Sequence, residues 1–251
     1  RQLEEELQQR LFLRTTKSLS ITPHGRELYD YAVQVLSLQD RLLAGWRQGD
    51  SVVSLGASTI PSAYLLPNLL ARFSVLHPDI SFGVLRALRT GRFDLGLTGM
   101  TAPDEDLVFT PLYQDAMVLI APNTPEFSAA KAQNMPLAAL LQSHPLLLRE
   151  NGSGSQRSAD DFLRAAGLKT DALHVAARLN DQESIKNLVA AGLGLAIVSA
   201  VSVARERDRG DLLVFPLANA ARTFYVVTRR HDFLSPAARQ FFDFSVRFYT
   251  E

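Results

Sequence analysis

The sequence predicts an α/β protein with two lobes, preceded by a small basic hairpin and a long helix. From Ser51 onward, short apolar runs alternate with amphipathic segments, a rhythm typical of a mostly parallel sheet covered by helices. Two interruptions divide this region, APNTPEF at 121–127 and PLANAAR at 216–222. We therefore expect the chain to cross from a first lobe to a second and then to return.

The composition is that of a globular protein. The 251 residues suffice for one large domain or two medium ones, and the apolar fraction is 47%. No apolar run approaches the roughly 18 residues that span a bilayer, and no charged-then-apolar export signal opens the chain. The absence of cysteine excludes disulfides, thiolate metal sites and cysteine nucleophiles. These features fit a cytoplasmic protein without a membrane partner.

The N-terminal stretch RQLEEELQQRLF places leucines four residues apart, which predicts one face of a helix. The helical pattern is already under way at Arg1, so we expect residues to precede it. Residues 11–22 (LFLRTTKSLSIT) predict two short strands around a polar turn.

The charge of this region is uneven, although the whole chain has 26 basic and 26 acidic residues. Residues 7–26 contain no Asp or Glu. A local basic patch on a neutral chain is typical of a small nucleic-acid contact. The alternative is a solvated stretch that lacks acidic residues by chance. The basic residues of the stretch are Arg10, Arg14, Lys17 and Arg26.

Thr22 and Pro23 predict a helix start, because threonine caps helix N-termini and proline is favoured at the first helical position. We expect this helix to run to about Trp46. Apolar residues spaced by seven on a long helix favour packing against a partner helix. The alternative is packing against its own domain. The stripe includes Leu28, Val35, Leu42 and Trp46.

The body of the chain contains nine strand candidates and a final helix at about 235–249. The expected strands are Val52–Ala57, Ile80–Val84, Phe93–Thr98, Met117–Ala121, Leu146–Leu148, His174–Arg178, Gly194–Val198, Leu212–Phe215 and Thr223–Val227.

Hydroxyl and amide residues follow several of these strands, directly before predicted helices. Helix starts present free backbone N–H groups and the positive end of a dipole. If two or three converge on the cleft between the lobes, they form a site for a small anion. The alternative is that each residue only caps its own helix, as Asn180 would with Glu183 in a capping box. The expected ligand-binding residues are Ser58, Thr59, Thr98, Ser153, Ser155 and Asn180.

Nothing in the sequence indicates an enzyme, a metal or a cofactor. The five histidines lack metal-ligand spacing, and the chain has no HExxH, P-loop, GxGxxG or GxSxG motif. Acidic pairs such as Asp160 and Asp161 fit loops and first helical turns. We therefore expect no catalytic residue, metal ligand or cofactor.

The N-terminal 32 residues closely resemble the end of the DNA-binding domain of LysR-type transcriptional regulators. That family has roughly I-R-x-L-E-x-x-L-G-x-x-L-F-x-R, then a turn and L-T-x-x-G. Gln8 stands where the family usually has Gly. The resemblance continues through LLPNLLARFSVLHPDI, GRFDLGLTG, GSGSQRSADDFL and IKNLVAAGLGLAIVS. The matching positions are Arg1, Leu3, Glu4, Leu7, Leu11, Phe12, Arg14, Thr22 and Gly25.

This resemblance implies three parts. Residues 1–22 would end a winged helix-turn-helix, and residues 23–48 would form a dimerising linker helix. Residues 51–251 would form an effector domain resembling periplasmic binding proteins. Its lobe I would span 51–121 and 222–251, and its lobe II would span 122–221. The implied function is a regulator that senses a small, anionic metabolite, and the alternative is a solute-binding protein for transport.

The implied partners are double-stranded DNA, a small-molecule effector and further copies of the chain in a homodimer or homotetramer. The family usually has several more residues between Val84 and Leu85, so residues at that cleft edge are incompletely predicted. The start of the recognition helix would precede Arg1, so the operator sequence is not predicted. The residues expected to contact DNA are Arg1, Arg10, Arg14, Thr16 and Lys17.

Overall fold

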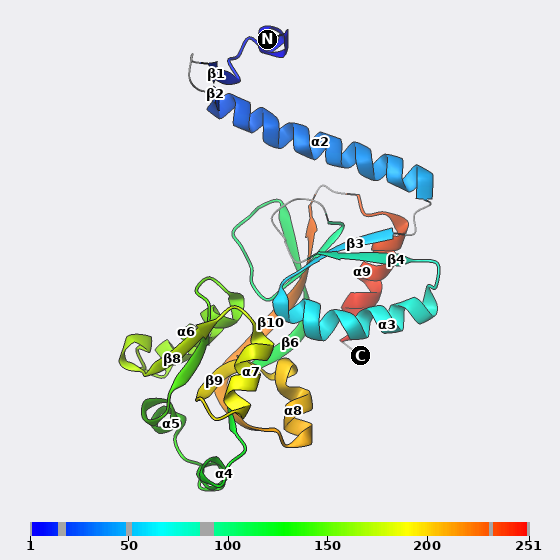
Figure 1. Cartoon of the computed structure of the whole chain (residues 1–251). Helices are drawn as coiled ribbons and strands as arrows, with labels where there is room; N and C mark the ends of the chain where they lie inside the picture. The colour runs from blue at the N-terminus through cyan, green and yellow to red at the C-terminus, as the bar shows by residue number, and fades with distance from the viewer. Residues whose placement is uncertain (1, 15–18, 49–51, 86–92, 231–232, 250–251) are drawn as a thin grey trace.

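The computed structural model describes residues 2–14, 19–48, 52–85, 93–230 and 233–249. Figure 1 shows a small N-terminal hairpin, one long helix and an α/β body. This order of parts agrees with the order that the sequence predicts.

The N-terminal part consists of α1 (Gln2–Glu6), β1 (Phe12–Arg14), β2 (Leu19–Ile21) and α2 (Pro23–Gln48). The two strands pair antiparallel. The Glu4 carboxylate ties α1 to the hairpin, because its Oε1 accepts from the backbone N–H groups of residues 11 and 12 at 2.8 and 3.0 Å.

Thr22 caps α2 as predicted. Its Oγ1 accepts from the backbone N–H of Gly25 at 3.0 Å and donates to the carbonyl of Arg10 at 2.6 Å. The threonine hydroxyl therefore joins the helix start to the residue before the hairpin.

The body contains an eight-stranded sheet with the order β4-β3-β5-β10-β6-β9-β7-β8. The sheet is mixed, with four parallel and three antiparallel pairings, so the expected parallel pairing holds for the strands at its two ends and not for the two central strands. The three strands at each end are parallel to one another, whereas β10 and β6 pair antiparallel with each other and with their neighbours. The strands are β3 (Val52–Ala57), β4 (Ser81–Leu85), β5 (Leu95–Thr98), β6 (Leu107–Pro122), β7 (Leu146–Arg149), β8 (Val175–Leu179), β9 (Leu195–Ser199) and β10 (Leu212–Arg229).

Two long central strands replace the shorter ones that the sequence predicts. β6 begins at Leu107, ten residues before the expected start, because Pro111 obscures the strand pattern. Pro111 lies beside a register shift, where strand proline is tolerated. β10 joins the two strands predicted at 212–215 and 223–227, and residues 217–220 form a second register shift within it. The expected break at 216–222 is therefore a bulge in one strand.

The sheet has two halves, each with its own hydrophobic core. One core lies among β3, β4, β5 and two helices, and the other half has a core on each face of its sheet. β6 and β10 contribute side chains to both halves. The lobe boundaries expected at 121 and 222 stay a prediction.

The helices of the body cover the two halves of the sheet (Figure 1). α3 and α9 pack together over the first half, and α6 and α7 contact strands of the second. The helical segments are η1 (Pro61–Leu65), α3 (Leu66–Leu76), α4 (Pro125–Ala132), α5 (Leu137–Ser143), α6 (Gly154–Ala165), η2 (Thr170–Ala172), α7 (Gln182–Ala190), η3 (Ala200–Val203), α8 (Ala204–Arg209) and α9 (Pro236–Phe248).

Candidate functional site

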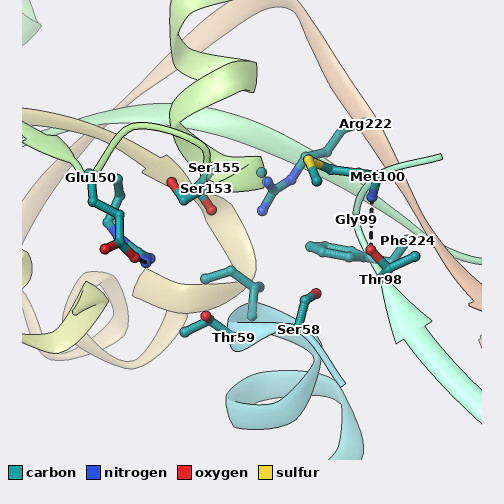
Figure 2. A pocket seen from close by; sticks show the side chains of 13 residues that line it. Ser58, Thr59, Thr98, Gly99, Met100, Glu150, Ser153, Ser155, Arg222 and Phe224 are labelled. Carbon is teal, nitrogen blue, oxygen red and sulfur yellow. Dashed lines mark hydrogen bonds and ion pairs between the residues drawn. The ribbon is translucent and has the colours of Figure 1, made fainter. Parts of the chain in front are cut away.

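A cavity of about 230 Å³ lies between the two halves of the sheet. Its first wall is formed by the residues that follow β3 and β5, and its second by the end of β7 and the start of α6. Ser58 and Thr59 face Ser153 and Ser155 across it in Figure 2. β10 supplies a further wall through Arg222 and Phe224.

Five of the six predicted ligand-binding residues line this cavity, although no ligand shows that they bind one. Asn180 is not among the lining residues. Its backbone carbonyl instead accepts a hydrogen bond from Arg149 at 2.9 Å. Two of the three predicted helix starts, those at Ser58 and Ser153, therefore converge on the cavity. The third, at Asn180, is connected to the cavity by its hydrogen bond with Arg149. The five are Ser58, Thr59, Thr98, Ser153 and Ser155.

The start of α6 is open toward the cavity. Ser153 is its cap, and its Oγ accepts from the backbone N–H of Gln156 at 3.1 Å. Gly154 and the buried Ser155 follow and line the same wall. The free N–H groups of this first turn and the helix dipole make the wall favourable for negative charge.

The predicted cap of α7 is wrong by one residue. Asp181, not Asn180, caps this helix, and its Oδ2 accepts from the N–H of Ser184 at 2.7 Å and from its hydroxyl at 2.8 Å. These hydrogen bonds lower the pKa of Asp181. An aspartate satisfies a helix start as well as asparagine does, so the choice between neighbours depends on the loop backbone.

Arg149, the last residue of β7, was not predicted as a site residue. Its side chain is only 4% exposed, and its Nη2 lies 3.6 Å from the half-exposed carboxylate of Glu150. Among the described residues, no hydrogen-bond partner reaches its buried Nε. The sequence signal for Arg149 is a charged residue at the end of the apolar run LLLR.

The sequence also gives no signal for Arg222 as a site residue, because it ends the segment PLANAAR, whose composition predicts a break between strands. Its Nε donates to Asp115 at 2.8 Å, and its guanidinium lies 4.6 Å from the centre of the Phe224 ring. Burial lowers the pKa of Arg222, against the opposing effect of Asp115. The guanidinium still carries its proton, because no protein environment deprotonates arginine at neutral pH.

A second polar cluster joins the two halves beside the cavity. The hydroxyl of Tyr64 in η1 donates to the carboxylate of Glu183 in α7. Lys186, with a side chain 4% exposed, contacts Glu183 at 2.8 Å, Glu206 at 2.7 Å and the carbonyl of Ser202 at 2.9 Å. Burial and the bond to Glu183 raise the pKa of Tyr64 well above its usual value. We call this contact between Tyr64 and Glu183 the inter-half latch.

Few of the predicted DNA-contacting side chains fall in the described part of the chain. Arg10 is exposed, at the end of the turn after α1. Arg14 ends β1, but its side chain lies outside the described residues. Arg1, Thr16 and Lys17 lie outside the described residues altogether.

The predicted dimerisation stripe lies on α2. Leu28 is partly buried, and Val35 is 45% exposed. The side chains of Leu42 and Trp46 lie outside the described residues.

Within the described ranges, no three His, Asp or Glu side chains gather as metal ligands would. Over the same ranges, no helix combines the length and the apolar character needed to cross a membrane.

Residues 47–249 match the LysR substrate binding domain family. The chain belongs to this family. The match covers the whole α/β body and confirms the resemblance that the N-terminal motif indicated. The α/β body is therefore a LysR-family substrate-binding domain.

A relative named as an HTH-type transcriptional regulator agrees with this assignment over almost the full length of the chain. The chain is 29% identical over 252 residues to the uncharacterized HTH-type transcriptional regulator YeiE of Escherichia coli (strain K12). The alignment covers 96% of this chain and 84% of that protein. A solute-binding protein for transport, the alternative function, is not favoured.

Solved structures show the same fold. The regulatory domain of CcmR from Synechocystis PCC6803, in complex with 2-PG, has a TM-score of 0.69 and 23% identity, and the match covers 80% of this chain and 98% of that one. Full-length CbnR complexed with its target DNA has a TM-score of 0.66 and 19% identity, over 99% of this chain and 87% of that one. The second match includes the N-terminal hairpin and α2.

Proposed function

We propose that this LysR-family chain regulates transcription by binding a small anion in the cavity between its two halves. Occupancy of the cavity would change how the N-terminal region holds DNA. A ligand that binds one arrangement of the halves more tightly shifts the population toward that arrangement. The effector acts through this difference in affinity, without a catalytic step.

One observation carries the anion assignment. The open start of α6 and two buried arginines, each with an unpartnered N–H among the described residues, line the same cavity. Buried donors without partners cost free energy, and helix starts favour oxyanions. At about 230 Å³ the cavity is smaller than typical drug-sized pockets, so a compact ligand fits it. The CcmR regulatory domain, with a similar fold, was solved in complex with 2-PG, which supports a small-molecule effector.

Calorimetry tests the effector assignment on the full-length protein. Sulfate, thiosulfate and small carboxylates are titrated, and at least one is expected to bind. Arg149→Ala should weaken that binding about tenfold, because a charge-assisted hydrogen bond is lost. Arg164→Ala is the matched control, since this arginine of α6 is 75% exposed and pairs with Asp161. Binding of an apolar aromatic compound, with none of the anions, would contradict the proposal.

We propose that Arg10, Arg14, Thr16 and Lys17, together with Arg1, contact DNA phosphates. Such contacts position a protein on DNA without specifying sequence. Each neutralised phosphate steepens the dependence of log affinity on log salt by about 0.9. Arg14→Ala and Lys17→Ala in the full-length protein should each flatten that slope by about this amount. Lys169→Ala, in the body, is the control, and unchanged slopes would rule out phosphate contact.

We propose that α2 pairs with a second copy through Leu28, Val35, Leu42 and Trp46. In the part of the helix with described side chains, Val33, Val35 and Leu36 are exposed, which supports an apolar partner. Light scattering should give the mass of a dimer or a tetramer. A regulator of DNA works where the DNA is, so we place the protein in the cytoplasm.

A further inference from the structure

Arg222 lines the cavity from one of the two strands, β6 and β10, that run through both halves of the sheet. It lies on β10 directly opposite Asp115 of β6 in the strand register. Figure 2 shows its guanidinium pointing toward Ser155 and the interior of the cavity. Any molecule that fills the cavity therefore meets this side chain.

The guanidinium is fixed before any ligand arrives. Asp115, whose side chain is 1% exposed, holds Nε of Arg222 at 2.8 Å. That carboxylate is itself held by the hydroxyl of Ser199 at 2.6 Å and by the N–H of Val201 at 3.3 Å. The ring of Phe224 packs against the guanidinium on another side. One buried donor, Nη2, has no partner among the described residues, and the side chain is only 8% exposed.

A second donor of the same kind lies on the second wall. Nε of Arg149 is buried and unpartnered among the described residues, beside the start of α6. A buried N–H without an acceptor has lost its hydrogen bond to water and destabilises the folded protein. Two such donors lining one cavity therefore point to a ligand with two oxygen acceptors.

The two ends of the cavity, one at Arg149 and the other at Arg222, differ in charge. The charge of Arg222 is neutralised by a buried carboxylate at 2.8 Å. Among the described residues, the carboxylates near Arg149 are those of the half-exposed Glu150, at 3.6 Å, and of the exposed Asp181, which already accepts two hydrogen bonds from Ser184. Water screens both of these carboxylates, so the end near Arg149 keeps more positive character. A second oxyanion at Arg222 would face Asp115 in a region of low dielectric, where like charges repel strongly.

We infer that the effector is a small hydroxy acid or oxo acid. Its carboxylate lies at Arg149 and the start of α6, and its uncharged oxygen accepts a hydrogen bond from Nη2 of Arg222. Phe224 and Met100 provide apolar surface along the carbon chain. Arg222 then determines specificity, because it distinguishes an acid with this oxygen from one without it. This inference rests on the proposed anion-binding function.

Two sets of acids of equal length test the inference by calorimetry on the full-length protein. The sets are propionate, lactate and malonate, and butyrate, 3-hydroxybutyrate and succinate. In at least one set, the hydroxy acid should bind about tenfold more tightly than the plain acid and more tightly than the diacid. In the Arg222→Gln variant, the hydroxy acid and the plain acid should bind with nearly equal affinity.

A second variant tests the effect of the Arg222 charge on the choice of ligand, separately from any loss of structure. Asp115→Asn leaves the Arg222 charge unbalanced, so the diacid should gain affinity relative to the hydroxy acid. Circular dichroism and thermal melting show whether each variant is folded.

Three results would overturn the inference. The first is that the unchanged protein binds a diacid most tightly. The second is that Arg222→Gln weakens the binding of all three acids of a set equally. The third is that the protein binds sulfate and none of the carboxylates. None of these three results would contradict the proposed anion-binding function. If neither sulfate nor any carboxylate binds, both the inference and the proposed function fail.

Discussion

At the scale of single residues, buried charged side chains have defined partners that lie far away in the sequence. Arg222 and Asp115 are 107 positions apart, and Lys186 and Glu206 are 20 apart. Removing one partner of such a pair leaves an unpaired charge in a dry environment, which costs several kcal/mol. These contacts therefore fix the geometry of the cavity and limit which substitutions it tolerates.

The cap of α7 gives a residue-scale prediction. Asp181→Ala should destabilise the protein by about 1 kcal/mol at neutral pH, because the N–H of Ser184 loses its acceptor. The folded-state pKa of Asp181 is lowered, so its contribution is complete above the unfolded value of about 3.9. It is lost as the pH falls through the folded-state value. Denaturant titrations at several pH values should show the difference between the proteins shrinking below about pH 4.

Asp181→Asn is the matched control, because asparagine caps helices as well as aspartate does. At neutral pH this variant should retain most of the stability. If it loses as much as the alanine variant, the charge and not the cap is responsible.

At the scale of elements, the N-terminal hairpin packs against α2 through a close backbone approach. A Cβ built on Gly25 would lie 2.2 Å from the carbonyl oxygen of Leu11 and 2.8 Å from Cγ1 of Ile21. Since the first clash is with backbone, a side-chain rotation cannot relieve it. Gly25 therefore allows the helix start to lie directly beside the hairpin.

Gly25→Ala should displace the hairpin and lower DNA affinity, and binding of the effector to the body should be unchanged. Gly83→Ala is the control, because nothing lies within 4 Å of its added Cβ. Fluorescence anisotropy with operator DNA and calorimetry with the effector measure the two activities separately. Equal DNA affinity in both variants would show that the hairpin does not depend on this contact.

The packing of α3 on α9 is the main aromatic contact of the first half. Phe73 is fully buried, with the rings of Phe241 and Phe244 at 5.1 and 5.3 Å. The planes of these rings meet that of Phe73 at 90° and 68°, the edge-to-face geometry that aromatic pairs prefer. This cluster connects a helix near the start of the body to the last helix of the chain.

Phe73→Ala should lower the free energy of unfolding by about 3–5 kcal/mol, because it removes a buried ring and leaves a cavity. Val75→Ala on the same helix, 79% exposed, should change it by less than about 0.5 kcal/mol. Chemical denaturation measures both. A small effect at Phe73 would mean that the cluster is not tightly packed in solution.

At the scale of the whole molecule, the two halves are connected by two long strands and by the inter-half latch. A chain of hydrogen bonds leads from the cavity toward the latch, from Arg222 through Asp115 to Ser199, whose carbonyl accepts from Ser202. The carbonyl of Ser202 in turn accepts from Lys186, which contacts Glu183 of the latch. Ligand contacts at Arg222 and the contact between the halves therefore share one network.

Breaking the latch should weaken effector binding about fivefold, which corresponds to about 1 kcal/mol for a partly exposed hydrogen bond to a carboxylate. The change acts on the population of the described arrangement and not on a ligand contact. Tyr64→Phe and Glu183→Ala each remove the hydrogen bond and should each show the effect, and the double variant should be no weaker than either one. Calorimetry with the identified effector measures the affinities.

Tyr29→Phe, on α2, is combined with Glu183→Ala as the control pair and should give additive changes. Additive changes for Tyr64 and Glu183 as well would show that the two residues are not coupled.

Sequence patterns were enough to predict the family, the α/β class, the cap at Thr22 and the presence of Ser58, Thr98 and Ser153 at or shortly after the ends of strands. These features follow from local periodicity, capping chemistry and a linear motif. Three features became visible only in the folded molecule: β10 is one continuous strand, Asp181 is the cap of α7, and Arg149 and Arg222 line the cavity. The continuity of β10 and the meeting of the two arginines depend on the register between strands distant in sequence, and local patterns contain no information about that register. The choice of Asp181 as the cap depends on the backbone of the loop before α7.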